Sequence, residues 1–329
     1  MSMPTHAKSF RRAIGVTAAA LVFAAGCASS NNNQPQDETP AAGAVVTTLA
    51  PSAAAPAAAE KAPKETTAAA APATQPVYSV PYRIPKVDEV TATLQHLRDR
   101  LDAWAPVPQG GATPAPTERH QGLIGYPIGV AYAGMIAAYE ATGDKAFADF
   151  DAKRFEWIAE QVKRQTENPP PDEQPVAGRP LRNPVRNLLK PNSLDSCGAM
   201  NAAFVKAKRA NIGPDMDKAI QIASDWVSHK QFRLQDGTLA RNRPFKNSLW
   251  GDDMFMGTSL LGQMGALSGD RSYFDDAAKN VVQMSQRLFI PSAGLFTHAW
   301  NAETGDNQPT YFWGRANGWN IVAMAELLS

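Results

Sequence analysis

The sequence predicts an all-α domain from about Pro85 to the end of the 329-residue chain. Apolar residues recur there at helical spacing, whereas alternating runs rich in Val, Ile and Thr, which would predict strands, are scarce. Two kinds of helix alternate: one is apolar on most of its surface, and the other carries a charged face. This alternation predicts concentric layers with the apolar helices inside, as in an α/α toroid, although a stacked helical solenoid would show it too.

Seven segments carry the helical pattern. In chain order they are residues 87–104, 129–142, 145–162, 195–210, 216–229, 252–268 and 271–288. The Pro-rich stretch QTENPPPDEQPVAGRP at residues 165–180 predicts a surface loop. The residues after Trp319 carry the pattern of one more helix.

Two junctions, ATGDKAF and LSGDRSY, share the order helix, Gly, Asp and new helix. Gly143 and Gly269 suit the left-handed conformation that ends a helix, and Asp144 and Asp270 suit the N-cap of the next helix. Tight turns of this kind join antiparallel helices. The domain is therefore expected to consist of helical hairpins.

The N-terminus has the pattern of a secretion signal. Three basic residues precede an uncharged run, AIGVTAAALVFAAG, which is too short to span a membrane and stops at Cys27. FAAGC resembles the lipobox of bacterial lipoproteins, which implies a signal peptide at residues 1–26 and a lipidated Cys27. Because Ala28 is not the Asp of inner-membrane retention, the expected location is the cell envelope, at the outer membrane or facing the periplasm. An uncleaved anchor, or an ordinary signal peptide with an incidental Cys, is the alternative.

Residues 27–84 are expected to be a tether, and residues 85–329 the folded domain. The tether is rich in Ala, Pro, Thr, Ser, Asn and Gln, and it cannot bury enough apolar surface to offset the entropy of ordering. Cys197 has no partner in the mature chain and sits in an apolar helix, so an inert core thiol is expected. The net charge of +1 gives no argument for a nucleic-acid partner.

The stretch LWGDDMFMG places two adjacent acids, Asp252 and Asp253, before an apolar helix. One Asp is enough to cap a helix, so the second acid needs another explanation. Four of the seven tryptophans lie in the last third of the chain, near polar residues, where such rings can line a cleft. They are Trp250, Trp300, Trp313 and Trp319, whereas Trp157 and Trp226 are expected in the core.

Three motifs together resemble a known family. They are NSLWGDDMFMGTSLLGQMGALSGD (247–270), GLFTHAWN (294–301) and FWGRANGW (312–319). In this order they resemble glycoside hydrolase family 105, the unsaturated rhamnogalacturonyl hydrolases, and more distantly the unsaturated glucuronyl hydrolases of family 88. The resemblance runs from about residue 115 to the end and implies a six-hairpin α/α toroid. Because the chain stops at Ser329, a toroid truncated at its C-terminus is expected.

The resemblance implies hydrolysis at a Δ4,5-unsaturated uronic acid, which ends a pectin or glycosaminoglycan fragment. In this family an Asp protonates C4 and water adds at C5, unlike the attack at the anomeric carbon by other glycosidases. Asp252 matches the catalytic Asp of the W-x-D motif. Asp195 matches the second acidic position, expected to hold the water and orient Asp252, and it is equally expected to cap the helix that follows. Asp253 is then the acid expected to cap its own helix.

Further residues are expected to bind the substrate. Trp250 and Trp313 would pack on sugar faces, and Arg315 and His298 match substrate-contacting positions of the family. Asp253 and Arg241 are expected beside them. Arg241 and Asn242 stand where many relatives carry His-Lys, so the preference for an aglycone sugar does not carry over.

Other chemistry finds little support in the sequence. No H-E-x-x-H or G-x-S-x-G motif occurs, so neither a metal nor another cofactor is expected. The expected partners are an unsaturated oligosaccharide and, through the lipid alone, a membrane. The main alternative is a catalytically inactive carbohydrate-binding lipoprotein of the same fold. An epimerase or lyase on a related toroid would be expected to carry catalytic His pairs, which the sequence does not show.

Overall fold

The structure, a computed structural model, describes residues 85–108, 122–167, 185–305 and 311–328. The predicted signal peptide, Cys27 and the tether lie outside these residues. Within them, no helix is both long and apolar enough to cross a membrane.

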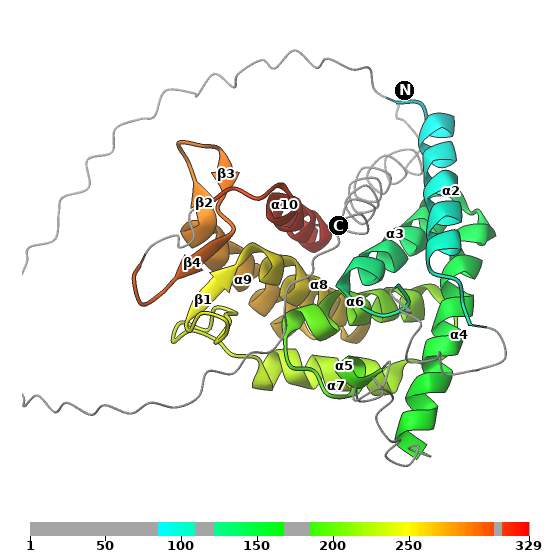
Figure 1. The fold of residues 1–329 in the computed structure, drawn as a ribbon, viewed down its shortest axis with the longest axis horizontal. Helices are drawn as coiled ribbons and strands as arrows, with labels where there is room; N and C mark the ends of the chain where they lie inside the picture. Colours follow the sequence, from blue (N-terminus) through cyan, green and yellow to red (C-terminus); the bar gives the residue numbers. More distant parts are fainter. Residues whose placement is uncertain (1–84, 109–121, 168–184, 306–310, 329) are drawn as a thin grey trace, which may run out of the picture. The chain divides into compact units, whose positions relative to one another are not determined.

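The described chain is mainly helical, and all seven predicted helices are present (Figure 1). The helix predicted at residues 145–162 continues to Glu167, so residues 165–167 of the predicted loop are helical, and the rest of that stretch lies outside the described residues. The helix predicted at the end of the chain is also present. The bounds are α2 (Val87–Trp104), α3 (Tyr126–Thr142), α4 (Lys145–Glu167), α5 (Arg186–Leu189), α6 (Leu194–Ala210), α7 (Asp217–Asp225) with a π-helical turn η2 (Trp226–Lys230), α8 (Gly251–Ser268), α9 (Arg271–Leu288) and α10 (Gly314–Leu328).

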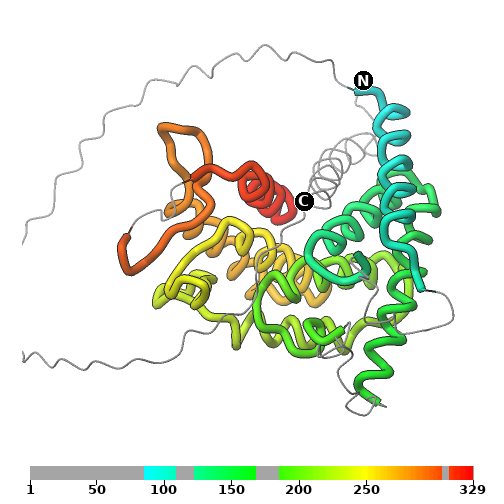
Figure 2. The backbone as a smooth tube through the Cα atoms, in the orientation of Figure 1, coloured from blue at the N-terminus to red at the C-terminus, as the bar shows by residue number. Residues whose placement is uncertain are grey.

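The helices form an inner and an outer layer. The inner helices pack side by side in chain order, α3 on α6, α6 on α8 and α8 on α10, while α4, α7 and α9 pack on α3, α6 and α8 respectively. Figure 2 follows the backbone through this alternation. Most residues of α6 and α8 are buried, whereas α9 buries only Ala277, Asn280, Met284 and Leu288. The prediction that the apolar helices lie inside is therefore confirmed.

Glycines let the inner helices approach closely. A Cβ atom at Gly129 would lie 2.7 Å from the backbone nitrogen of Met200, and one at Gly198 would overlap the backbone of Met256. These positions join α3 to α6 and α6 to α8. The predicted helix ends are also confirmed: Gly143 and Gly269 adopt φ values of 72° and 74°.

The caps that follow these glycines are confirmed as well. Asp144 accepts a hydrogen bond from the Ala146 backbone at 3.0 Å, and Asp270 accepts one from the Ser272 backbone at 2.9 Å. Cys197 is fully buried, as predicted, and burial raises the pKa of its thiol.

Short strands, which the sequence did not predict, occur in the connections that run from an outer helix to the next inner helix along the chain. β1 (Ser248–Trp250) pairs antiparallel with β4 (Ala299–Asn301), and β2 (Phe289–Ile290) pairs with β3 (Leu295–Phe296). Strands of two or three residues are too short for alternation to reveal them. Because β1 runs directly into α8, its pairing with β4 places β4 beside the start of that helix.

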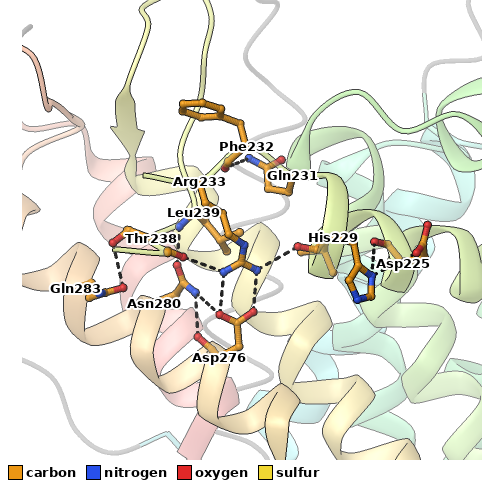
Figure 3. A network of polar contacts seen from close by, with 12 residues as sticks. Asp225, His229, Gln231, Phe232, Arg233, Thr238, Leu239, Asp276, Asn280 and Gln283 are labelled. Atoms are coloured by element: carbon orange, nitrogen blue, oxygen red, sulfur yellow. Dashed lines mark hydrogen bonds and ion pairs between the residues drawn. The ribbon is translucent and has the colours of Figure 1, made fainter. Parts of the chain in front are cut away.

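The segment before β1 is clamped to α9 (Figure 3). Arg233 donates to both carboxylate oxygens of Asp276, at 2.8 and 2.7 Å. Asn280 accepts a hydrogen bond from the Leu239 backbone at 2.7 Å. These bonds hold the chain that continues, two residues later, to Arg241.

Candidate active site

The candidate site forms where three inner helices begin. Asp195 lies in the first turn of α6, Asp252 and Asp253 lie in the first turn of α8, and Arg315 is the second residue of α10. A helix N-terminus carries a partial positive charge and favours anions. The fold thus collects acidic side chains, and a place for an anionic ligand, at one end of the inner layer.

Asp252 is bonded to His298. Trp250 has an extended backbone and precedes α8, and the amide of Gly251 donates to the carbonyl of His298 at 2.9 Å. This pairing brings Nε2 of His298 to 3.1 Å from Oδ2 of Asp252. The exposed fractions are 9% for Asp252 and 5% for His298, so the pair is largely shielded from solvent.

Tyr311 completes a chain of three side chains. Its hydroxyl lies 2.5 Å from Nδ1 of His298, and its carbonyl accepts a bond from the His298 amide at 3.0 Å. Burial, and then the charge of Asp252, raise the pKa of Tyr311. Sequence reasoning missed this residue, although it directly precedes the FWGRANGW motif.

Two tryptophans enclose the imidazole of His298. The ring centroid of Trp250 lies 4.9 Å from it at an interplanar angle of 83°, and that of Trp313 lies 4.7 Å away at 63°. The guanidinium carbon of Arg315 lies 4.0 Å from the centroid of the Trp313 ring. The rings thus hold the imidazole in place and leave half-buried aromatic surface beside it.

Asp253 does not cap α8, and that prediction is wrong. The N-cap residue is Trp250, with no side-chain cap. Asp253, with only 1% of its surface exposed, receives hydrogen bonds from Nε and Nη2 of Arg241 at 2.7 and 2.8 Å. A two-bond ion pair with a guanidinium is stronger than a capping bond, which explains the different outcome.

Asp195 does not cap α6 either, because Ser193 is the N-cap and forms a capping box with Ser196. Nη2 of Arg241 donates to Asp195 at 3.0 Å, so the guanidinium bridges Asp195 and Asp253. Burial raises the pKa of Asp195 to about 6, against the charge of Arg241. Burial likewise raises the pKa of Asp253, again opposed by Arg241. Both carboxyl groups thus hold protons more readily than exposed ones.

The structure brings all eight predicted site residues into one connected set. The guanidinium carbon of Arg241 lies 4.9 Å from the Trp250 ring centroid, which links the acidic cluster to the aromatic one. The set comprises Asp195, Arg241, Trp250, Asp252, Asp253, His298, Trp313 and Arg315.

Two of the late tryptophans lie elsewhere. Trp319 is fully buried and stacks on Phe255 at 4.9 Å, and Trp300 lies beside Arg287. Asn317, which sequence reasoning left without a role, ties α10 to β3 by exchanging two 2.8 Å hydrogen bonds with the Phe296 backbone. In the part of the chain that the structure describes, no group of three or more His, Cys, Asp or Glu could hold a metal ion.

Curated proteins with a similar sequence act on unsaturated sugars. The chain is 24% identical over 208 residues to the unsaturated rhamnogalacturonyl hydrolase YesR of Bacillus subtilis (strain 168). The aligned region covers 62% of this chain and 53% of YesR. It is 29% identical over 82 residues to the unsaturated 3S-rhamnoglycuronyl hydrolase of Alteromonas sp. (strain LOR), covering 24% and 20% of the two chains. The chain thus spans about half the length of YesR, and less of the second relative.

Solved structures share the fold. A possible member of the GH105 family from Klebsiella pneumoniae subsp. pneumoniae MGH 78578 aligns with a TM-score of 0.51 at 19% identity, over 74% of this chain and 59% of that one. A possible GH105 member from Salmonella enterica subsp. enterica serovar Paratyphi A gives a TM-score of 0.51 at 17% identity, over 72% and 59%. The predicted all-α toroid is confirmed, while its truncation stays a prediction. Residues 110–329 match Glycosyl Hydrolase Family 88, and the chain belongs to that family.

Proposed function

We propose that the protein removes a terminal Δ4,5-unsaturated uronic acid from oligosaccharides by hydrating the C4=C5 double bond. The observation that carries this proposal is Asp252, shielded from solvent at the start of α8 and bonded to His298 between two tryptophan rings. A general acid needs such a shielded, oriented position beside a surface on which a sugar can lie.

Asp252 has the role of acid and then base. Its carboxyl group gives a proton to C4, where the electrons of the double bond form the new C–H bond. Water then bonds to C5 and returns a proton to Asp252. The product is a hemiketal at C5, which opens and releases the rest of the oligosaccharide. Asp195, whose pKa is raised to about 6 by burial, is proposed to hold the water.

The remaining residues bind the sugar. Trp250 and Trp313 offer half-buried ring faces, and Arg315, stacked on Trp313, offers a planar guanidinium to the uronate carboxylate. Arg241 was predicted to contact the substrate, which stays a prediction, but its Nε and Nη2 atoms already bind Asp253 and Asp195. We therefore assign Arg241 mainly to the arrangement of the acids.

The test uses unsaturated oligosaccharides generated from pectin and glycosaminoglycans by lyases. Turnover removes the conjugated double bond and its ultraviolet absorbance. Asp252→Asn should lower kcat by at least about a hundredfold and still bind substrate, because an amide cannot donate to C4. The matched control is Asp270→Asn at the start of α9, where Asn also caps. Tight calorimetric binding with no absorbance loss in the wild type would favour a binding protein without catalysis.

We also propose that Cys27 is lipidated and that the protein is attached to the cell envelope. The support is the basic and apolar N-terminal pattern that ends at FAAGC. Acyl chains on a single Cys would supply the multiple anchors that stable attachment requires.

A further inference from the structure

Both ring nitrogens of His298 have partners. Nδ1 lies 2.5 Å from the Tyr311 hydroxyl, and Nε2 lies 3.1 Å from Oδ2 of Asp252. A neutral imidazole has one donor and one acceptor nitrogen, and the partner of one nitrogen decides what the other does. Tyr311 therefore bears on the bond that His298 makes to Asp252.

The types of partner and the longer distance favour one arrangement. An N–H donor normally lies about 2.7–3.2 Å from its oxygen acceptor, and an ionised carboxylate only accepts, whereas a hydroxyl can donate or accept. The 3.1 Å contact therefore fits Nε2–H donating to Asp252, which leaves Nδ1 as the acceptor for the Tyr311 hydroxyl. In the reverse arrangement, a protonated Asp252 would donate to Nε2 across the 3.1 Å contact, which is long for a hydroxyl donor.

We propose that Tyr311 is a positioning residue that fixes the tautomer of His298, so that Nε2–H occupies Oδ2 of Asp252 and leaves Oδ1 to carry the transferred proton. The backbone supports this role, because the His298 amide donates to the Tyr311 carbonyl at 3.0 Å. The rings of Trp250 and Trp313 limit rotation of the imidazole. The assignment of the transferred proton rests on the proposed function, whereas the tautomer does not.

Other charges also act on Asp252. Asp195, Asp253 and Arg241 are all close enough to interact with it electrostatically. A change in the pH dependence of turnover would therefore not isolate the contribution of Tyr311. The tautomer of His298 must be measured directly.

The experiment is nuclear magnetic resonance of the whole protein with ¹⁵N-labelled histidine. Long-range ¹H–¹⁵N correlations distinguish the two tautomers of each of the five His residues, and His298→Gln assigns the signal. Above about pH 7.5, wild-type His298 should carry its proton on Nε2. Tyr311→Phe should convert it to a mixture that includes Nδ1–H. The control is Tyr139→Phe, near the C-terminal end of α3, which should leave the His298 signal unchanged.

Kinetics give the second readout. Tyr311→Phe should lower kcat by roughly tenfold to a hundredfold, a part of the 10²–10⁴ that a positioned acid contributes, and change KM less than about twofold. A wild-type His298 protonated on Nδ1, or a tautomer unchanged by Tyr311→Phe, would overturn the inference. Since Tyr311 is 44% exposed, Tyr311→Phe should fold. The tautomer of His298 in the wild-type protein tests the inference even if that variant does not fold. If no unsaturated oligosaccharide is hydrolysed, the proposed function fails while the tautomer measurement still decides the role of Tyr311.

Discussion

Replacing Arg241 by Gln should destabilise the protein strongly, and more so as the pH rises. Arg241 makes two charge-assisted bonds to Asp253, which is 1% exposed, and one to Asp195. Removing one partner of a buried ion pair costs about 3–5 kcal/mol, because the other charge stays buried without compensation. For a domain of this size the melting temperature should fall by roughly 6–20 °C at pH 7.5.

The direction of the pH effect follows from the pKa values. Burial already raises the pKa of Asp195 and Asp253 above the ordinary value of 3.8, against the pull of Arg241. Without Arg241 both values rise further, so the folded state binds protons more strongly than the unfolded state. The stability that this proton binding adds to the folded variant is complete below about pH 4 and is lost as the pH rises. The cost of Arg241→Gln should therefore be small near pH 4 and largest above pH 7.

Thermal unfolding followed by circular dichroism measures this cost. Asp253→Asn in the Arg241→Gln background should recover most of the loss, because it removes the stranded charge. The matched control is Arg271→Gln, whose ion pair with Asp275 is highly exposed, and its effect should stay within about 0.5 kcal/mol. A cost below about 1 kcal/mol at pH 7.5, or no recovery in the double variant, would show that this ion pair is not what holds the acids.

Three further predictions concern other parts of the chain. Gly198→Ala should lower the free energy of unfolding by about 1–3 kcal/mol, since its Cβ would overlap the Met256 backbone. Gly262→Ala, whose added Cβ would have its nearest neighbour at 4.0 Å, should raise it by up to about 1 kcal/mol. Chemical denaturation measures both changes. Asp151 is fully buried and has no hydrogen-bond partner among the described residues, and burial raises its pKa well above 3.8. Asp151→Asn should therefore gain stability over wild type near pH 8 and none near pH 4. Equal gains at both pH values would contradict this. Cys27→Ala should release the protein from the membrane fraction, and an unchanged distribution in fractionated cells would favour an uncleaved anchor.

The helices could be predicted from the sequence because their signals are local and long. Each predicted segment spans several turns, and the ends carry Gly143 and Gly269, whose left-handed conformation few other residues adopt readily. The layers could be predicted because apolar and charged helices differ in composition. The cleft position expected for Trp319 is wrong, although its burial could have been predicted, because Ala316, Trp319, Val322 and Ala323 repeat at helical spacing and form the buried face of α10.

The contacts within the site could not be predicted, because sequence spacing says nothing about which polar groups meet. Arg241 lies 12 residues from Asp253 and 46 from Asp195, and no local pattern marks either pair. The contact between Tyr311 and His298 joins residues 13 apart in the chain, and no local pattern marks it. The capping rule failed at Asp253 for the same reason: it compares a side chain with its own helix and cannot include a distant guanidinium.

The two adjacent acids divide their roles because of helix geometry. Neighbouring residues on an α-helix point about 100° apart, so two consecutive side chains in the first turn of α8 face different neighbours. Asp252 faces His298, within the aromatic cluster, while Asp253 faces Arg241 and the acid of α6. Asp253 is therefore expected to act on the reaction indirectly, by holding the guanidinium that orients Asp195. Substitution of either acid should reduce turnover, and Asp253→Asn should also change the pH dependence of stability, because burial raises the pKa of that carboxyl group and Arg241 pairs with it.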